Sequence, residues 1–288
     1  MPMTHLVIQA PDLAQAAIEH VSALARARRI VELAPGAVRL TEADDTPAAR
    51  AQVAAYCQEA RVDWAYVEPG ARLADWKVLA MDMDSTLINI ECIDEIADMA
   101  GLKPQVAAIT EAAMRGEIAD FSESLTRRVA LLQGLPLEAL EQVYVERLRL
   151  NPGAERLLLA AQRVGIKTLL VSGGFTWFTS RLQQRLQLNE AHANTLEVEN
   201  GRLTGKVQGA ILDADGKARH LREFAQRHGA PLSRAIAVGD GANDLKMLGL
   251  AGLSVAYHAK PVVREQTSRA LNVCGLDGIL NWFEDTLG

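Results

Sequence analysis

Two clusters of acidic residues lie far apart in the sequence, and each follows a short apolar run. The first contains Asp82 and Asp84, and the second contains Asp240 and Asp244. An aspartate can attack phosphorus when a cation neutralises the phosphoryl oxygens, and a second aspartate two residues away can then transfer protons. Hard Mg²⁺ prefers carboxylate oxygens, so the second cluster supplies candidate metal ligands. For Asp244, an ordinary helix N-cap is the alternative interpretation.

Two smaller features of the sequence could hold a phosphate. Ser172 and Gly173 stand in a small-residue turn between an apolar run and a helical pattern, where a hydroxyl and free N–H groups can bind phosphate oxygens. Lys217 stands at the start of a predicted helix and could supply a fixed positive charge. Taken singly, such turns are common and such a lysine is usually exposed. Their combination with the acidic clusters indicates phosphoryl chemistry.

These residues fall where predicted strands end and predicted helices begin. Apolar runs predict strands at residues 78–81, 166–171, 235–238, 253–256 and 271–273, with helical patterns between them. This alternation predicts a doubly wound α/β fold with a Rossmann-like parallel sheet. Residues beyond the carboxyl ends of such strands line one crevice, where the acidic clusters can meet. Asn200 and Gly201, between two alternating runs, also predict a β-hairpin.

Two further parts of the chain have patterns of their own. Residues 1–70 alternate in the order βαββαβ, which predicts a small α+β domain of the ferredoxin-like (ACT-like) type. Amino-acid sensing and a structural or dimerising role are both open for this domain, and pairing of exposed sheet edges would give a homodimer. A second domain spans residues 76–288. Helical patterns at about residues 92–150 predict a helical cap inserted after its first catalytic strand.

Composition and charge exclude several classes of protein. Of the 288 residues, 49% are hydrophobic and 23% are charged, as in a globular protein with a large core. The net charge of -6 argues against binding to nucleic acid or to an anionic membrane. No apolar run reaches the ~18 residues that span a bilayer, and no secretory signal is apparent, so we expect a cytoplasmic protein. The three cysteines lack the spacing of a zinc site.

The ordered motifs resemble those of the haloacid-dehalogenase (HAD) superfamily, and within it the phosphoserine phosphatases. The resemblance covers about residues 76–275. It rests on Asp82-Met83-Asp84-Ser85-Thr86-Leu87-Ile88, Glu91-Cys92-Ile93-Asp94-Glu95-Ile96-Ala97, Met114-Arg115-Gly116-Glu117, Phe121-Ser122-Glu123-Ser124-Leu125 with Arg127-Arg128-Val129, Val171-Ser172-Gly173-Gly174-Phe175 and Val238-Gly239-Asp240-Gly241-Ala242-Asn243-Asp244. It implies Mg²⁺-dependent hydrolysis of O-phospho-L-serine to L-serine and phosphate through an aspartyl-phosphate, in the last step of serine biosynthesis.

The resemblance also implies a role for each matching residue. Asp82 is the nucleophile, and Asp84 is the acid that protonates the leaving oxygen and later activates water. The Mg²⁺ ligands are Asp82, the backbone carbonyl of Asp84 and Asp240, with Asp244 in support. The phosphoryl group is held by Ser172, the N–H of Gly173 and Lys217, Asn243 lies beside it, and Thr86 braces the nucleophile loop.

The same resemblance implies that residues of the cap select the substrate. Phosphoserine carries an ammonium and a carboxylate besides its phosphate, so a selective pocket needs one acid and one arginine. Glu91 and Arg128 match these positions, whereas Arg127 points about 100° away on a helix. Met114 and Phe121 match apolar positions that close over the substrate.

Two other functions fit part of this pattern. One is a phosphatase for another small phosphomonoester, such as phosphohomoserine or phosphothreonine, or a phosphotransferase. The other is a phosphorylation-controlled binding module similar to a bacterial receiver domain, which also has an acidic metal site, an accepting aspartate, a hydroxyl and a lysine. A receiver needs neither an acid such as Asp84 nor a large cap, so these features separate the two classes.

Overall fold

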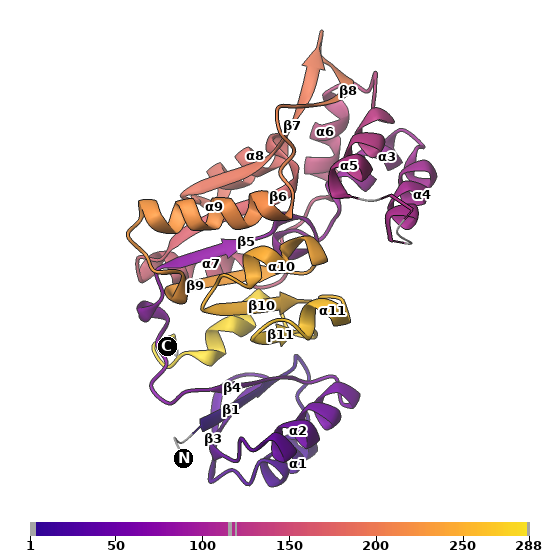
Figure 1. The fold of residues 1–288 in the computed structure, drawn as a ribbon. Helices are drawn as coiled ribbons and strands as arrows, with labels where there is room; N and C mark the ends of the chain where they lie inside the picture. The colour runs from indigo at the N-terminus through magenta and orange to yellow at the C-terminus, as the bar shows by residue number, and fades with distance from the viewer. Residues whose placement is uncertain (1–3, 115–116, 119, 287–288) are drawn as a thin grey trace.

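Within residues 4–114, 117–118 and 120–286, which the computed structural model describes, the chain forms a four-stranded and a seven-stranded β-sheet. Figure 1 shows the smaller, N-terminal sheet at one end of the molecule, the larger sheet in the middle and a group of helices at the other end. In the described part of the chain, no helix is both long and apolar enough to cross a membrane.

The N-terminal sheet is antiparallel and has the strand order β2-β3-β1-β4. Its elements are β1 (Thr4–Gln9), α1 (Gln15–Leu24), β2 (Arg29–Ala34), β3 (Ala37–Ala43), α2 (Pro47–Glu59) and β4 (Asp63–Val67). Leu6, Ile8 and Leu40 point from one face of the sheet into a buried apolar cluster that also contains Ile18 and Val53 from the two helices. The predicted βαββαβ order of elements is confirmed.

The larger sheet has the order β11-β10-β9-β5-β6-β7-β8, and every neighbouring pair is parallel except β7 and β8. Its strands are β5 (Val78–Met81), β6 (Lys167–Phe175), β7 (Glu190–Glu199), β8 (Arg202–Gln208), β9 (Ala235–Gly239), β10 (Leu253–Tyr257) and β11 (Arg269–Leu271). The predicted doubly wound α/β fold and the predicted β-hairpin are therefore confirmed.

The central strand β5 is buried on both faces, which explains its uninterrupted apolar sequence. Val78 and Ala80 pack with residues of α9 (Ala214–Arg227) and α10 (Leu245–Leu248). Leu79 and Met81 point to the opposite face, into the cluster that contains residues of α7 (Ala154–Arg163) and α8 (Thr176–Leu186). Because both faces are covered, polar groups at this strand can lie only at its ends.

A group of helices, which we call the cap, is inserted between β5 and β6. It consists of α3 (Cys92–Met99), α4 (Lys103–Met114), α5 (Phe121–Ala130), α6 (Glu138–Gln142) and the turn Val143–Arg147. The two chain segments that join the cap to the sheet are tied together by Asn151, whose side-chain amide donates to the carbonyl oxygens of Thr86 and Ile88 at 2.8 and 3.0 Å. The β7–β8 hairpin makes a second attachment, because Gly134 donates its N–H to the carbonyl of Leu203.

Short segments deviate most from the sequence prediction. The helical pattern at residues 137–148 divides into α6 and the wider turn Val143–Arg147, and the segment near 279–283 is a 3₁₀ helix, Leu276–Trp282. The short helix α11 (Pro261–Arg264) was not predicted. Elements of four to seven residues contain too few turns for an apolar period to define them.

Buried polar contacts join the N-terminal sheet to the rest of the chain. Asp63 is 2% exposed, and its carboxylate accepts hydrogen bonds from the backbone N–H groups of Asn272, Val273 and Cys274 at 2.6, 3.0 and 2.8 Å. Burial raises the pKa of Asp63, and these hydrogen bonds oppose the shift. One carboxylate at the start of β4 therefore fixes that strand next to the segment that follows β11.

Candidate active site

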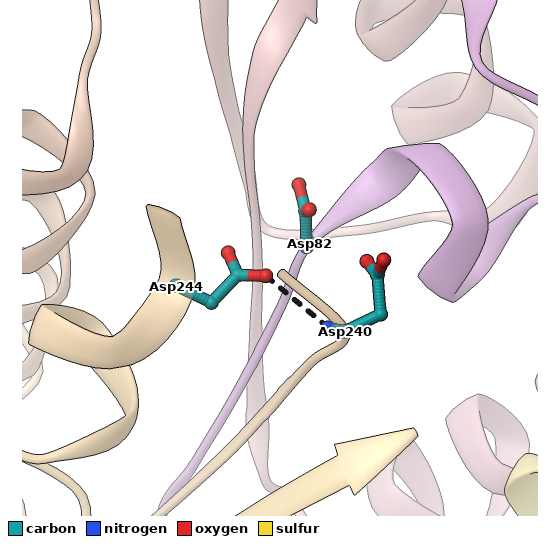
Figure 2. A group of neighbouring side chains, drawn as sticks. All are labelled: Asp82, Asp240 and Asp244. Carbon is teal, nitrogen blue, oxygen red and sulfur yellow. Dashed lines mark hydrogen bonds between the residues drawn. The ribbon is translucent and has the colours of Figure 1, made fainter. Parts of the chain in front are cut away.

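The two acidic clusters meet at the carboxyl ends of β5 and β9, which are neighbouring parallel strands. Asp82 directly follows β5, Asp240 directly follows β9, and Asp244 lies four residues further on. One carboxylate oxygen from each of the three residues lies within 4.8 Å of the other two (Figure 2). The predicted convergence of the clusters is confirmed.

Lys217 joins two of these carboxylates. Its Nζ lies 2.7 Å from Asp82 Oδ1 and 2.6 Å from Asp244 Oδ1, and its side chain is only 1% exposed. Although burial favours the neutral amine, the negative charges of Asp244 and Asp82 raise the pKa of Lys217, so the side chain is charged. A solvent-exposed lysine, the default interpretation of this position from the sequence, is wrong.

Asp244 is fully committed to contacts within the protein. Its Oδ1 binds Lys217, and its Oδ2 accepts the backbone N–H of Gly241 at 3.1 Å. The same Oδ2 accepts the backbone N–H of Asp240 at 3.2 Å (Figure 2). Asp244 stands at the N-cap position of α10, but its side chain makes no capping hydrogen bond to that helix and instead holds the loop that precedes it. Gly239 allows this close approach, because a Cβ at that position would lie 2.6 Å from Asp244 Cγ.

Asp82 and Asp240 retain oxygens for a cation. Asp82 Oδ1 contacts Lys217 and accepts the Met83 N–H at 2.7 Å, and Asp240 Oδ1 accepts the Thr86 hydroxyl at 3.0 Å. No hydrogen bond from the described residues reaches the second oxygen of either carboxylate. Figure 2 shows the two side chains next to each other and pointing in the same direction. Hard oxygen donors of this kind suit a divalent metal ion.

The charges at this site are unbalanced. Burial and the charge of Asp244 raise the pKa of Asp240 to about 6. The same two effects raise the pKa of Asp82 well above its usual range, although Lys217 opposes them. The cluster thus contains three carboxylates but one ammonium, which pairs with two of them. A divalent cation would offset the excess negative charge, so the residues present fit such an ion.

Asp84 points to a different environment from Asp82. It lies in the turn Met83–Leu87, in which Ser85 has a φ of 55°. Its Oδ1 accepts the N–H of Cys92 at 3.1 Å, and its Oδ2 accepts the Ser172 hydroxyl at 3.4 Å. Burial raises the pKa of Asp84. A carboxyl group with a raised pKa can carry a proton to a leaving group.

The predicted small-residue turn lies within an irregular part of β6. The pairing of β6 with β7 shifts register between Val171 and Phe175, which releases backbone groups from the ladder. The Gly174 N–H donates to the Ser172 hydroxyl at 2.8 Å. A Cβ at Gly174 would lie 2.5 Å from Asp84 Oδ2, so a larger residue would displace the carboxylate.

Asn194 holds this segment from β7 and was missed by the sequence analysis. Its Nδ2 donates to the carbonyl of Gly173 at 2.8 Å, and its Oδ1 accepts the N–H of Leu212 at 2.7 Å. The residue is 2% exposed. The only signal in the sequence is a polar amide in a strand, and such a residue could equally face solvent.

A cleft of about 690 Å³ separates the carboxyl ends of the strands from the cap. Its lining includes Asp82, Asp84, Gly173, Asp240 and Asn243 from the sheet side, and Glu91, Phe121 and Arg128 from the cap side. Arg127 is not among the lining residues, as predicted, and pairs with Glu123 on an exposed part of α5. The predicted apolar residue Met114 ends α4, and its side chain lies outside the described part of the structure.

Opposite charges face each other on the cap side of the cleft. Burial and the nearby charge of Asp84 raise the pKa of Glu91 to about 7, although part of the residue still meets solvent, and its Oε1 accepts the Ser85 hydroxyl at 2.7 Å. Burial lowers the pKa of Arg128, and the carboxylates of Asp94 and Glu91 oppose that shift. The cap therefore presents the Arg128 guanidinium and several carboxylates, including Glu91 and Asp94, to the same cavity.

The sequence profile of the haloacid dehalogenase-like hydrolase family matches residues 79–249, which contain both acidic clusters and the cap. The chain belongs to this family. Residues 6–53 match a separate domain family of unknown function, DUF4072. The family match thus covers the part of the chain that carries the candidate active site.

Relatives within the haloacid dehalogenase-like hydrolases include phosphoserine phosphatases. One from Polaromonas sp. is 56% identical over 216 residues, which are 74% of this chain and 92% of that protein. A family hydrolase from Salmonella enterica serovar Typhi has a TM-score of 0.89 at 33% identity and covers 99% of both chains. A substrate-bound phosphoserine phosphatase has a TM-score of 0.68 at 38% identity, over 73% of this chain and 99% of that one.

We predict that Lys217→Met lowers the free energy of unfolding by roughly 3–5 kcal/mol, because it leaves Asp82 and Asp244 buried without their shared cation. Urea denaturation measures the loss. Lys246→Met is the matched control, since Lys246 pairs with Asp215 where both side chains are more than half exposed, and little change is expected there. Equally small losses in both variants would contradict the proposed importance of the buried ammonium.

Proposed function

We propose that this haloacid dehalogenase-like hydrolase is a phosphoserine phosphatase, which hydrolyses O-phospho-L-serine in the last step of serine biosynthesis. One observation carries the proposal: a partly buried acid, Asp84, lies beside the nucleophile position Asp82 and faces a cap that presents both a carboxylate and a guanidinium. The relative from Polaromonas sp., at 56% identity, supports the same substrate.

A panel of substrates tests the proposal directly. Phosphate release is measured from phosphoserine, phosphothreonine and phosphohomoserine, each with and without Mg²⁺. We expect the highest kcat/KM with phosphoserine and no turnover of any substrate after removal of divalent cations. A preference for another phosphomonoester would replace the proposed substrate, and an absence of turnover with all three would favour a receiver-like binding module.

The reaction proceeds in two steps. Asp82 attacks the phosphorus and forms an aspartyl-phosphate while the bond from phosphorus to the serine oxygen breaks, and Asp84 donates its proton to that oxygen. Water then attacks the aspartyl-phosphate. Asp84 takes the proton of this water, phosphate leaves, and the Asp82 carboxylate is restored. The raised pKa of Asp84 suits the first step, in which an alkoxide would be a poor leaving group.

The phosphate is held at the sheet side of the cleft. Ser172, the N–H of Gly173, Lys217 and Asn243 are its proposed contacts. Asp82, Asp240 and the backbone carbonyl of Asp84 would hold Mg²⁺, which when bound neutralises phosphoryl oxygens. Asp244 and Thr86 position these ligands through the contacts described above.

The cap selects the amino-acid part of the substrate. Glu91 binds the ammonium group, Arg128 binds the carboxylate, and Phe121 together with Met114 shields the substrate from water. Phe121 already touches the phosphate side, because a Cβ at Gly173 would lie 2.8 Å from its Cζ. Glu91 has a pKa of about 7 in the free protein, and an ammonium next to it would favour its charged form.

The proposal also includes the organisation of the chain. It comprises a ferredoxin-like (ACT-like) domain at residues 1–70, a catalytic domain at 76–288 with its cap at about 92–150, and a cytoplasmic location. Two chains would pair through β2, an edge strand in which Ile30 and Val31 are 47% and 43% exposed. Sedimentation of the full chain would measure that association.

We predict that Asp84→Asn lowers kcat by roughly two to four orders of magnitude, because an amide cannot donate the proton that the leaving oxygen needs. Phosphate release from phosphoserine measures the loss. Thermal denaturation and Mg²⁺ binding should remain near the wild-type values, since the amide keeps the shape of the side chain. Turnover at the wild-type rate would exclude Asp84 as the general acid.

We predict that Arg128→Ala raises KM for phosphoserine by about tenfold or more, because a charge-assisted contact with the substrate carboxylate is lost. KM for p-nitrophenyl phosphate, which has no carboxylate, should change much less. Arg127→Ala is the matched control, since the neighbouring side chain pairs with Glu123 outside the cleft. Equal losses with both substrates would reject the specificity role of Arg128.

A further inference from the structure

The cleft between the cap and the sheet is lined by more acids than bases. The lining carboxylates are Asp82, Asp84, Glu91, Asp94, Asp120 and Asp240, and the lining cations are Arg128 and Lys260. A phosphorylated amino acid is an anion, because its phosphate carries about −1.5 to −2 charges while its ammonium and carboxylate cancel. Such a substrate is repelled by the predominantly negative lining when it enters the cleft. An unpaired cation in that lining would reduce this repulsion.

Two cations near the reacting groups, Lys217 and Arg128, already have partners within the protein. Lys217 is buried between Asp82 and Asp244. Arg128 is largely buried on the cap, where its Nε donates to the carbonyl of Ser124 at 3.3 Å and the charges of nearby carboxylates act on it. Neither side chain can move toward an anion outside the cleft without giving up these contacts.

Lys260 differs from both of these cations. The residue is exposed. Across the part of the chain that the structure describes, no hydrogen bond or ion pair engages its ammonium group. Nothing in the sequence analysis singled it out, because an isolated lysine near a predicted strand end is an ordinary surface residue.

The backbone of Lys260 is nevertheless anchored at the catalytic end of the sheet. Lys260 follows β10, which runs parallel to β9 with Ala256 beside Gly239, so the chain leaves the sheet at the same end as Asp240. The Lys260 carbonyl accepts the N–H groups of Val263 and Arg264 at the start of α11, at 3.0 and 3.2 Å. Figure 1 shows α11 at the end of the sheet that faces the cap.

We propose that Lys260 is a substrate-attracting residue, whose positive charge draws the phosphate of the incoming substrate into the cleft. This inference rests on the proposed phosphatase function and adds a residue to it. The charge acts during entry, before any bond changes, so it contributes to kcat/KM and much less to kcat. Because the group is exposed, its effect extends over about 8–10 Å at physiological salt and shrinks as salt is added.

The test uses the full-length enzyme with Mg²⁺ and two dianionic substrates, phosphoserine and p-nitrophenyl phosphate. For Lys260→Gln at about 20 mM salt, we expect kcat/KM for both substrates to fall by about threefold to tenfold, with kcat within about twofold of wild type. At about 500 mM salt the difference should nearly vanish. Lys260→Arg should retain the wild-type kcat/KM, because it keeps the charge.

Lys167→Gln is the matched control. Lys167 is also exposed, but it begins β6 and so lies at the opposite end of the sheet, where its charge should leave kcat/KM unchanged. An unchanged kcat/KM for Lys260→Gln at low salt would overturn the inference, as would a loss that persists at high salt or falls mainly on kcat. Failure of the wild type with phosphoserine but not with p-nitrophenyl phosphate would reject only the proposed substrate, because the second substrate still measures the effect of Lys260.

Discussion

A single buried ammonium between two carboxylates determines the geometry of the active site. Lys217 comes from α9, Asp82 follows β5 and Asp244 lies beyond β9, so the contact joins three segments that are distant in the chain. None of these charges can be buried alone at acceptable cost, and they are therefore buried together. Through its second oxygen, Asp244 also fixes the loop that carries Asp240. One network of contacts thus positions Asp82, Asp240 and the ammonium of Lys217 relative to one another.

The same network explains how two aspartates separated by one residue can differ in chemistry. Asp82 is held by a cation at the sheet side, whereas Asp84 lies between the Ser172 hydroxyl and the start of the cap. The turn between them, in which Ser85 has a positive φ, sends the two side chains into these separate surroundings. Local backbone geometry therefore gives Asp82 and Asp84 the separate surroundings that their proposed roles as nucleophile and acid require.

The sequence predicts well what depends on local pattern. Apolar runs that stop at acidic residues located the ends of β5 and β9, and parallel pairing then required the two clusters to meet. What it missed depends on packing between distant elements. Lys217 is buried because α9 lies against the segment after β9. Asn194 contacts the Gly173 segment because β7 pairs with β6. Lys260 lines the cleft because β10, which precedes it, pairs with β9. No local period in the sequence records these contacts.

The two attachments of the cap limit how the cleft can open. Asn151 ties together the two linkers between the cap and the sheet, and the contact of Gly134 with Leu203 ties the cap to the β7–β8 hairpin. A rigid body held at two separate points keeps one easy motion, which is rotation about the line through those points. While both contacts persist, rotation about that line is the cap motion that they permit. Such a rotation would open the cleft most on the side away from the line.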